Sequence, residues 1–212
     1  MTMGGGAAPG PGAPDPVNEV AAAPTAGQGR LVGVIGSARI QPGDPRYAVA
    51  LRVGREMATA GFIVMTGGYG GLMEAVSRGA AEAGGAVIGL PVRGWDSLAP
   101  NPWIGEVRWV DSYFDRLTAF AACDVIVALD GGLGTLGEAA VAWANLQTDP
   151  GTNPPLVLFG RAWRRLHALI GELLVVDKRD LDLVRLVDRP EAVTGAIVDA
   201  IANRPTLGEP RG

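Results

Sequence analysis

The sequence predicts an α/β fold, a Rossmann-like doubly wound parallel sheet of about seven strands with helices on both faces. Short apolar runs alternate with amphipathic helical segments along the chain, which is the pattern of such sheets. Runs such as residues 31–35 and 125–129 are apolar throughout, as strands buried on both faces are. Glycine clusters follow two of the runs, at residues 67–71 and 131–137, and predict a ligand site at the carboxyl ends of the strands.

Each element has its own local signal. Pro45 suits a helix start, Gly61 and the Gly84-Gly85 pair suit helix ends, and Asp111 or Ser112 suits a helix cap. The predicted strands are residues 31–35, 62–65, 86–90, 106–110, 125–129, 155–159 and 183–187. The predicted helices are 45–60, 72–83, 112–122, 138–147, 161–175 and 190–202.

Composition divides the chain and excludes several classes of function. Residues 1–29 are rich in Gly, Ala and Pro and are expected to be a disordered tail. Residues 30–204 are expected to form one domain, and residues 205–212 to fray. A net charge of -4 gives no case for nucleic acid or an acidic membrane. One cysteine and one histidine exclude multi-Cys and paired-His metal sites, so we expect no metal and no cofactor. No run is long enough to span a membrane and no secretion signal is seen, so a cytoplasmic protein is expected.

The second glycine cluster predicts a phosphate site. The apolar run 125–129 leads into four glycines and Thr135, and helix-forming residues start at Glu138. Glycines let the backbone approach a ligand, and a helix N-terminus offers free N–H groups and a positive dipole end to an anion. A tight turn without a ligand is the alternative for either cluster alone. Two such clusters favour a nucleotide.

Three other sites are disfavoured by the same residues. Residues 132–137 match G-x-G-x-x-G, but a nicotinamide site needs that motif after the first strand. The single lysine, Lys178, follows no glycine loop, so there is no P-loop. Lys178 also lies far along the chain from both clusters, which argues against a pyridoxal phosphate decarboxylase.

Residues 131–138 (GGLGTLGE) resemble the P-G-G-x-G-T-x-x-E signature of the LOG (Lonely Guy) family. These proteins are cytokinin-activating phosphoribohydrolases, often mislabelled lysine decarboxylases. Residues 66–73 (TGGYGGLM) look like the family's other glycine block, Gly36-Ser37 fits its first strand end, and residues 143–146 fit its W-A-x-L stretch. The similarity covers about residues 31–190.

Two departures from the family pattern stand out. Asp130 replaces the proline, and its carboxylate would repel a phosphate unless it points away or binds a cation. The family's arginine in the preceding helix falls on Asp115 by a gapless count, with Arg116 one residue, or about 100°, further round. Related molybdenum-cofactor carrier proteins share the fold, so a non-catalytic nucleotide or molybdenum-cofactor carrier is the alternative function.

The resemblance implies hydrolysis of the N-glycosidic bond of a nucleoside 5′-monophosphate. Glu138 is the candidate carboxylate for the oxocarbenium-like transition state, with a helix-dipole role as its alternative. Arg116 is a candidate to bind the phosphate or to assist the leaving base. The alternative is a surface arginine paired with Asp115 or Asp111. Thr135 is a phosphate ligand or a helix cap.

The remaining candidates complete the predicted site. Glu74 is expected to touch the ribose hydroxyls or to be an exposed helical residue. Cys123 and His167 are expected to be structural. The resemblance and the apolar helix around residues 139–146 imply a homodimer. The predicted phosphate and nucleotide ligands are Gly36, Ser37, Gly67, Gly68, Gly70, Gly71, Glu74, Gly131, Gly132, Gly134 and Thr135.

Overall fold

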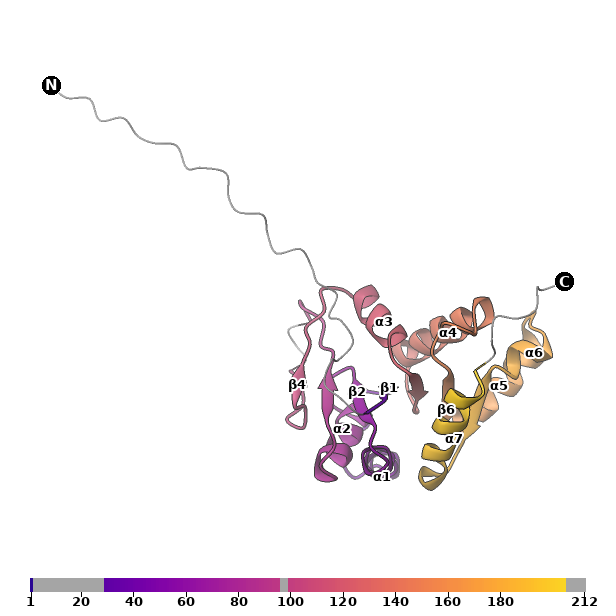
Figure 1. Ribbon diagram of the computed structural model, residues 1–212, viewed down its shortest axis with the longest axis horizontal. Coiled ribbons are helices and arrows are strands. Elements are labelled where there is room, and N and C mark those ends of the chain that lie inside the picture. The colour runs from indigo at the N-terminus through magenta and orange to yellow at the C-terminus, as the bar shows by residue number, and fades with distance from the viewer. Residues whose placement is uncertain (2–28, 96–98, 205–212) are drawn as a thin grey trace.

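The computed structural model describes residue 1, residues 29–95 and residues 99–204, so the predicted disorder of the N-terminal tail and fraying of residues 205–212 fall outside the described residues (Figure 1). The described part contains one seven-stranded sheet in the order β4-β3-β2-β1-β5-β6-β7, and every neighbouring pair is parallel. This confirms the predicted fold class. The strands are β1 (Leu31–Ile35), β2 (Ile63–Thr66), β3 (Val87–Gly89), β4 (Glu106–Val107), β5 (Val125–Ala128), β6 (Leu156–Phe159) and β7 (Val184–Val187).

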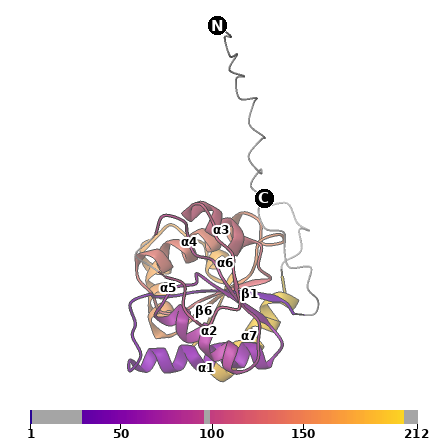
Figure 2. The same cartoon turned by 90° about the vertical axis from the view of Figure 1, so that its left-hand side faces the viewer.

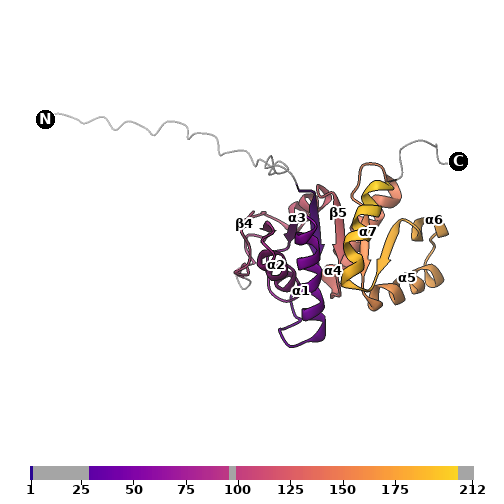
Figure 3. The ribbon, with the colours of Figure 1, turned by 60° about the horizontal axis from the view of Figure 1, so that its bottom comes forward.

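Helices cover both faces of the sheet (Figures 2 and 3). One buried apolar cluster joins α1 (Pro45–Thr59), α2 (Leu72–Glu82) and α7 (Pro190–Ala202) to the first face. The other cluster joins α3 (Tyr113–Ala121), α4 (Leu133–Thr148) and α5 (Arg161–Leu173) to the second face. Side chains alternate between faces along a strand, so Val32 and Val34 enter the first cluster while Leu31 and Ile35 enter the second. The two cores together hold the sheet.

The chain reverses its direction of winding between β1 and β5. From β1 it runs outward to β4 at one edge, and it then returns to β5 on the other side of β1. Both glycine segments therefore follow the carboxyl ends of strands close to this switch point, β2 in one case and β5 in the other. The prediction that they share one edge of the sheet is confirmed, and this is the edge where open α/β sheets bind ligands.

Three elements differ from the sequence prediction. The strand predicted over residues 106–110 shrinks to Glu106–Val107, both exposed, and Val110 adds only an isolated bridge to Val92. The short helix α6 (Lys178–Leu181) was not predicted. Helix α4 begins at Leu133 rather than Glu138, so most of the glycine cluster forms its first turn. Within the described residues, none of the helices has the length and apolarity needed to cross a membrane.

Helices α1 and α2 pack closely through glycines, which gives a stability prediction. A Cβ at Gly79 would lie 1.9 Å from the Leu51 carbonyl oxygen of α1, which is rigid backbone. We expect Gly79→Ala to lower the free energy of unfolding by about 1–3 kcal/mol, because overpacking must force the helices apart. Gly195→Ala in α7 is the matched control, since no atom lies within 4 Å of its Cβ position.

Both variants are compared with the unsubstituted chain by urea unfolding. Alanine is a better helix former than glycine, so the control should gain up to about 1 kcal/mol. A Gly79→Ala protein as stable as the Gly195→Ala protein would show that α1 and α2 tolerate a wider separation.

Candidate functional site

The N-terminus of α4 is open to an anion. Its N-cap is Gly132, which has no side chain to cap the helix, and its first turn contains no acidic residue. The first hydrogen bond back to the cap runs from Leu136 N to Gly132 O at 2.9 Å. The preceding N–H groups, up to Thr135, have no intrahelical acceptor, as in the first turn of any α-helix. This end of α4 can therefore donate several backbone hydrogen bonds to a phosphate.

Glu138, in the second turn of α4, forms a buried ion pair with Arg116 of α3. The Nε of Arg116 donates to Oε1 of Glu138 at 3.0 Å, and the two residues are only 4% and 7% exposed. The alternative of a surface arginine paired with Asp115 or Asp111 is therefore wrong. Asp111 pairs with Arg93 instead, and Asp115 lies next to the cap residue Ser112.

Arg116 also connects the two glycine segments. Its Nη1 donates to the carbonyl oxygens of Gly67 at 3.2 Å and Leu90 at 3.3 Å. A Cβ at Gly67 would lie 2.0 Å from Nη2 of Arg116, so this position must be glycine for the guanidinium to pass. The guanidinium carbon lies 5.6 Å from the ring centre of Tyr69. The structure thus brings three predicted site residues, Gly67, Arg116 and Glu138, into one cluster.

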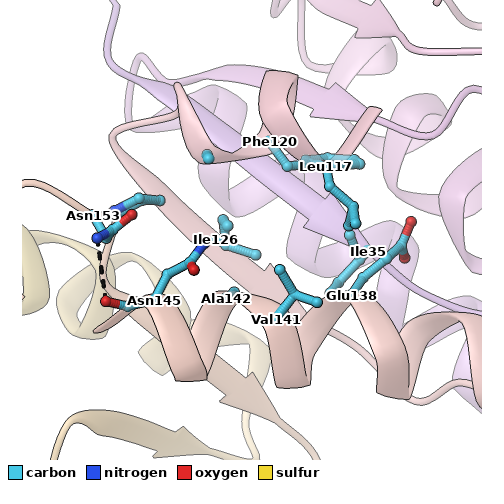
Figure 4. Close-up of a pocket in the computed structure, with 11 residues that line it drawn as sticks. Ile35, Leu117, Phe120, Ile126, Glu138, Val141, Ala142, Asn145 and Asn153 are labelled. Atoms are coloured by element: carbon cyan, nitrogen blue, oxygen red, sulfur yellow. Dashed lines mark hydrogen bonds between the residues drawn. The ribbon is translucent and has the colours of Figure 1, made fainter. Parts of the chain in front are cut away.

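The surroundings of Glu138 oppose its ionisation. Burial raises the pKa of this carboxyl above its usual value, and the charge and hydrogen bond of Arg116 counteract that rise. Beside it lies a small cavity of about 20 Å³, mostly apolar, between α3 and α4. Figure 4 shows Glu138 at one end of this cavity and Asn145 and Asn153 at the other. A carboxylate held between an apolar wall and a guanidinium is suited to stabilise a developing positive charge or to accept a proton.

Thr135 lies within the second glycine segment, and Ser37 lies between the two segments. Thr135 is buried in the first turn of α4, and its side chain fills the space where Gly131 lacks a Cβ. Because Gly132 is the N-cap, the alternative of Thr135 as the cap residue is wrong. Ser37 N donates to Asp130 O at 3.0 Å, and Ser37 O accepts from Leu72 N at 2.8 Å. The end of β1 therefore ties the two loops together through its backbone.

The other predicted ligands surround the first glycine segment. Gly71 is the N-cap of α2, with φ +70°. Glu74, in the first turn of α2, is partly buried and accepts from the Tyr47 hydroxyl at 3.3 Å, so an exposed helical glutamate is the wrong description. Its Oε2 is 3.6 Å from the position of a Cβ on Gly70. Gly36 packs between Leu129 and Leu72, and Gly68 has φ +85°.

The side chain of Asp130, just before the second glycine segment, points toward the start of α5. Its Oδ1 is buried without a hydrogen-bond partner and lies 2.9 Å from the position of a Cβ on Gly160, at the start of α5. Burial raises the pKa of Asp130, Arg46 lowers it and Asp44 raises it further. Asp130 also lines a pocket of about 340 Å³ with Trp163 and the first residues of α4. Its carboxylate is therefore turned toward α5.

The raised pKa of Asp130 predicts a pH-dependent effect of Asp130→Asn. A carboxyl whose pKa is higher in the folded state stabilises the fold below its unfolded pKa of about 3.9, and that contribution is lost as pH rises through the folded value. The variant cannot titrate there, so its stability relative to the unsubstituted chain should increase from acidic to neutral pH. Urea unfolding at a series of pH values measures this difference, and a constant or opposite trend would contradict the assigned shift.

Sequence reasoning missed four residues near the site. Asn101 is buried and donates from Nδ2 to the carbonyls of Gly68 at 3.2 Å and Tyr69 at 3.0 Å, which fixes the first glycine segment. Tyr69 lies within that segment, and its aromatic character was the available signal. The ring of Trp95 stacks on that of Tyr69, and the ring of Tyr113 stacks on that of Trp95. Cys123 is buried with its pKa raised to about 12, and His167 stacks on Trp143 with its Nε2 3.0 Å from the Leu181 carbonyl oxygen.

Comparison with known proteins adds a family and a fold. Residues 29–148 match the SLOG cluster4 family. An uncharacterized protein of Archaeoglobus fulgidus is 29% identical over 131 residues, 61% of this chain and 83% of that protein. A cytokinin riboside 5′-monophosphate phosphoribohydrolase of Arabidopsis thaliana is 40% identical over 88 residues, 40% of this chain and 39% of the relative, so the match spans less than half of that enzyme. The structure of the molybdenum cofactor carrier protein of Chlamydomonas reinhardtii superposes with a TM-score of 0.65 at 25% identity, covering 83% of this chain and all of that one.

Proposed function

The chain belongs to the SLOG cluster4 family, and from this premise we propose that it hydrolyses the N-glycosidic bond of a nucleoside 5′-monophosphate. AMP or a cytokinin riboside monophosphate is the expected kind of substrate, and a free base and ribose 5-phosphate are the products. The observation that supports this most strongly is the buried Arg116–Glu138 pair, one turn beyond the open N-terminus of α4. Sequence similarity to a plant phosphoribohydrolase points the same way.

The roles follow from the positions of the groups. The phosphate accepts from the N–H groups of residues 132–135, with Thr135 adding its hydroxyl. Glu138 faces the anomeric carbon, stabilises the positive charge that develops there, and takes a proton from the attacking water. Arg116 keeps the carboxylate ionised and oriented against the effect of burial. The leaving base takes up one proton from solvent, and Glu138 returns the proton of the attacking water to solvent after the step.

A comparison of AMP with adenosine tests this proposal. The two share the scissile bond, but only AMP has the phosphate that the α4 N-terminus binds. We expect adenine release from AMP and at least about 10²-fold slower release from adenosine, since binding energy at the phosphate is used to position the sugar. Chromatography measures the adenine released from each compound. Equal rates for AMP and adenosine would show that the phosphate site does not contribute to the reaction.

A non-catalytic carrier of a nucleotide or a molybdenum cofactor is the second candidate. Two observations favour it: the likeness to the Chlamydomonas carrier protein, and Asp130 in place of the proline of the hydrolase signature. A carrier would bind its ligand tightly and release no base. The same chromatographic assay, together with a binding measurement, separates the two functions.

A homodimer is the assembly that we propose. Glu138 is the one charged residue of α4 and it is buried, so the exposed face of this helix is uncharged and mostly apolar. Leu133 is 87% exposed, and Phe114 on the neighbouring α3 is 76% exposed. Exposed apolar surface of this kind marks an interaction site. Two copies should bury well over about 1,000 Å².

Light scattering at micromolar concentration should therefore report twice the chain mass of 21.8 kDa. Replacement of Phe114 by Asp should shift the population toward monomer, because it places a charge on the exposed apolar surface. A monomer in the unsubstituted chain would contradict the proposal.

A further inference from the structure

Three stacked aromatic rings border the Arg116–Glu138 pair. The rings of Tyr69 and Trp95 are 6.0 Å apart and inclined by 23°, and those of Trp95 and Tyr113 are 6.4 Å apart and inclined by 20°. Tyr69 is only 2% exposed, whereas Trp95 is 40% exposed. The stack thus has a buried tyrosine at one end, and its middle ring, the indole of Trp95, is partly open to solvent.

The stack is in contact with the candidate catalytic groups at both ends. Tyr69 lies beneath the guanidinium of Arg116. The Tyr113 hydroxyl is 3.5 Å from the position of a Cβ on Gly137, the residue before Glu138. Burial raises the pKa of Tyr113, and the charge of Glu138 raises it further, which reflects their proximity. Trp95 is therefore held between a ring that contacts Arg116 and a ring that lies next to Gly137.

The spacing along α4 matches the parts of a nucleotide. Gly137, next to the Tyr113 hydroxyl, lies five residues after the N-cap Gly132, which is about 7.5 Å along a helix. A ribose attached through its 5′ oxygen spans a gap of this kind between phosphate and base. With the phosphate on the α4 N-terminus and the sugar at Glu138, the base comes to lie against the aromatic stack.

We propose that Trp95 and Tyr113 form the base subsite, where a planar heteroaromatic ring stacks on the exposed part of the Trp95 indole. This rests on the proposed function for the position of the phosphate, but it adds residues and a ligand class. Every nucleobase has a π face, so stacking accepts many bases and favours the larger purine ring. The alternative is that Trp95 only covers Tyr69 and supports the fold of its loop.

The test compares a ligand that carries a base with one that has only the sugar phosphate. The first is the carbocyclic analogue of AMP, which lacks the ring oxygen that an oxocarbenium ion needs and so is not consumed. The second is ribose 5-phosphate. Calorimetry measures both affinities for the unsubstituted chain, for Trp95→Ala, and for Trp95→Phe, which retains a ring. Trp109→Ala is the control, since Trp109 is also exposed, at 47%, but lies over Arg93.

We expect Trp95→Ala to weaken binding of the AMP analogue by about 5- to 150-fold, the usual effect of removing a stacking side chain. Binding of ribose 5-phosphate should stay within about twofold, Trp95→Phe should fall between the extremes, and Trp109→Ala should change neither ligand. Equal losses for both ligands would show that Trp95 supports the fold of the site, and no loss for either would show that the base lies elsewhere. Both results overturn the proposal.

The outcome is separable from that of the proposed function. If AMP is never cleaved but Trp95→Ala weakens only the AMP analogue, the base subsite stands and the hydrolase is wrong. If AMP is cleaved and Trp95→Ala leaves the affinity for the analogue unchanged, the hydrolase stands and the base subsite is wrong.

Discussion

Glu138→Gln should reduce the turnover of a nucleoside monophosphate by about 10²–10⁴-fold, the usual range for a general acid–base group. The amide keeps the shape of the carboxyl and can still accept from Arg116 Nε, but it has no charge to stabilise an oxocarbenium ion. Nucleotide affinity should change little, because the phosphate is bound by N–H groups at the other end of the turn. Steady-state kinetics with AMP, together with calorimetric affinities, measure both effects.

Thr135→Ala is the counterpart of that variant. It removes a hydroxyl at the phosphate and should raise the dissociation constant more than it lowers the rate of the chemical step. Urea unfolding of both variants establishes that the fold is intact. A Glu138→Gln protein that hydrolyses AMP as fast as the unsubstituted chain would leave Glu138 as a helix residue that only pairs with Arg116.

Arg116→Met should have the largest effect on stability. It leaves the carboxylate of Glu138 buried without its cation, and the carbonyls of Gly67 and Leu90 lose a donor. Breaking a buried ion pair in this way costs about 3–5 kcal/mol in the free energy of unfolding. Without the guanidinium the pKa of Glu138 rises further, so the loss should be smaller at acidic pH, where the carboxyl binds a proton.

The double variant Arg116→Met/Glu138→Leu is the control. Replacing both partners of a buried pair by apolar side chains is often close to neutral, so much of the lost stability should return while activity stays absent. Urea unfolding of the single and double variants at neutral and acidic pH gives the comparison. An Arg116→Met protein as stable as the unsubstituted chain at neutral pH would mean that Glu138 is already protonated or hydrated there.

Most of the fold was predictable because its strands are uninterrupted apolar runs. The runs at residues 31–35 and 125–129 became β1 and β5, the two strands on either side of the switch point. The short edge strand β4 was harder, since an edge strand lacks a partner on one side and its two residues are exposed. The start of α4 was misplaced because glycine is a poor helix former, yet α4 is helical from Leu133 in spite of Gly134 and Gly137.

The candidate site was predictable in its residues but not in its contacts. A gapless count along the sequence put Asp115 at the position of the family's arginine. The cap at Ser112 instead turns Asp115 outward and Arg116 inward, where the long side chain of Arg116 reaches Glu138. The aromatic stack could not be foreseen, because Tyr69, Trp95 and Tyr113 come from three separate segments. Such contacts depend on tertiary packing, which no local pattern records.

The most direct test of the proposed function is to incubate the purified chain with AMP, GMP, CMP, UMP and a cytokinin riboside monophosphate and to quantify base and ribose 5-phosphate together. The account predicts that at least one compound yields the two products in equal amounts, and that Glu138→Gln yields them at least about 10²-fold more slowly. Tight binding of one of these monophosphates with no release of base from any of them would contradict it and establish a carrier.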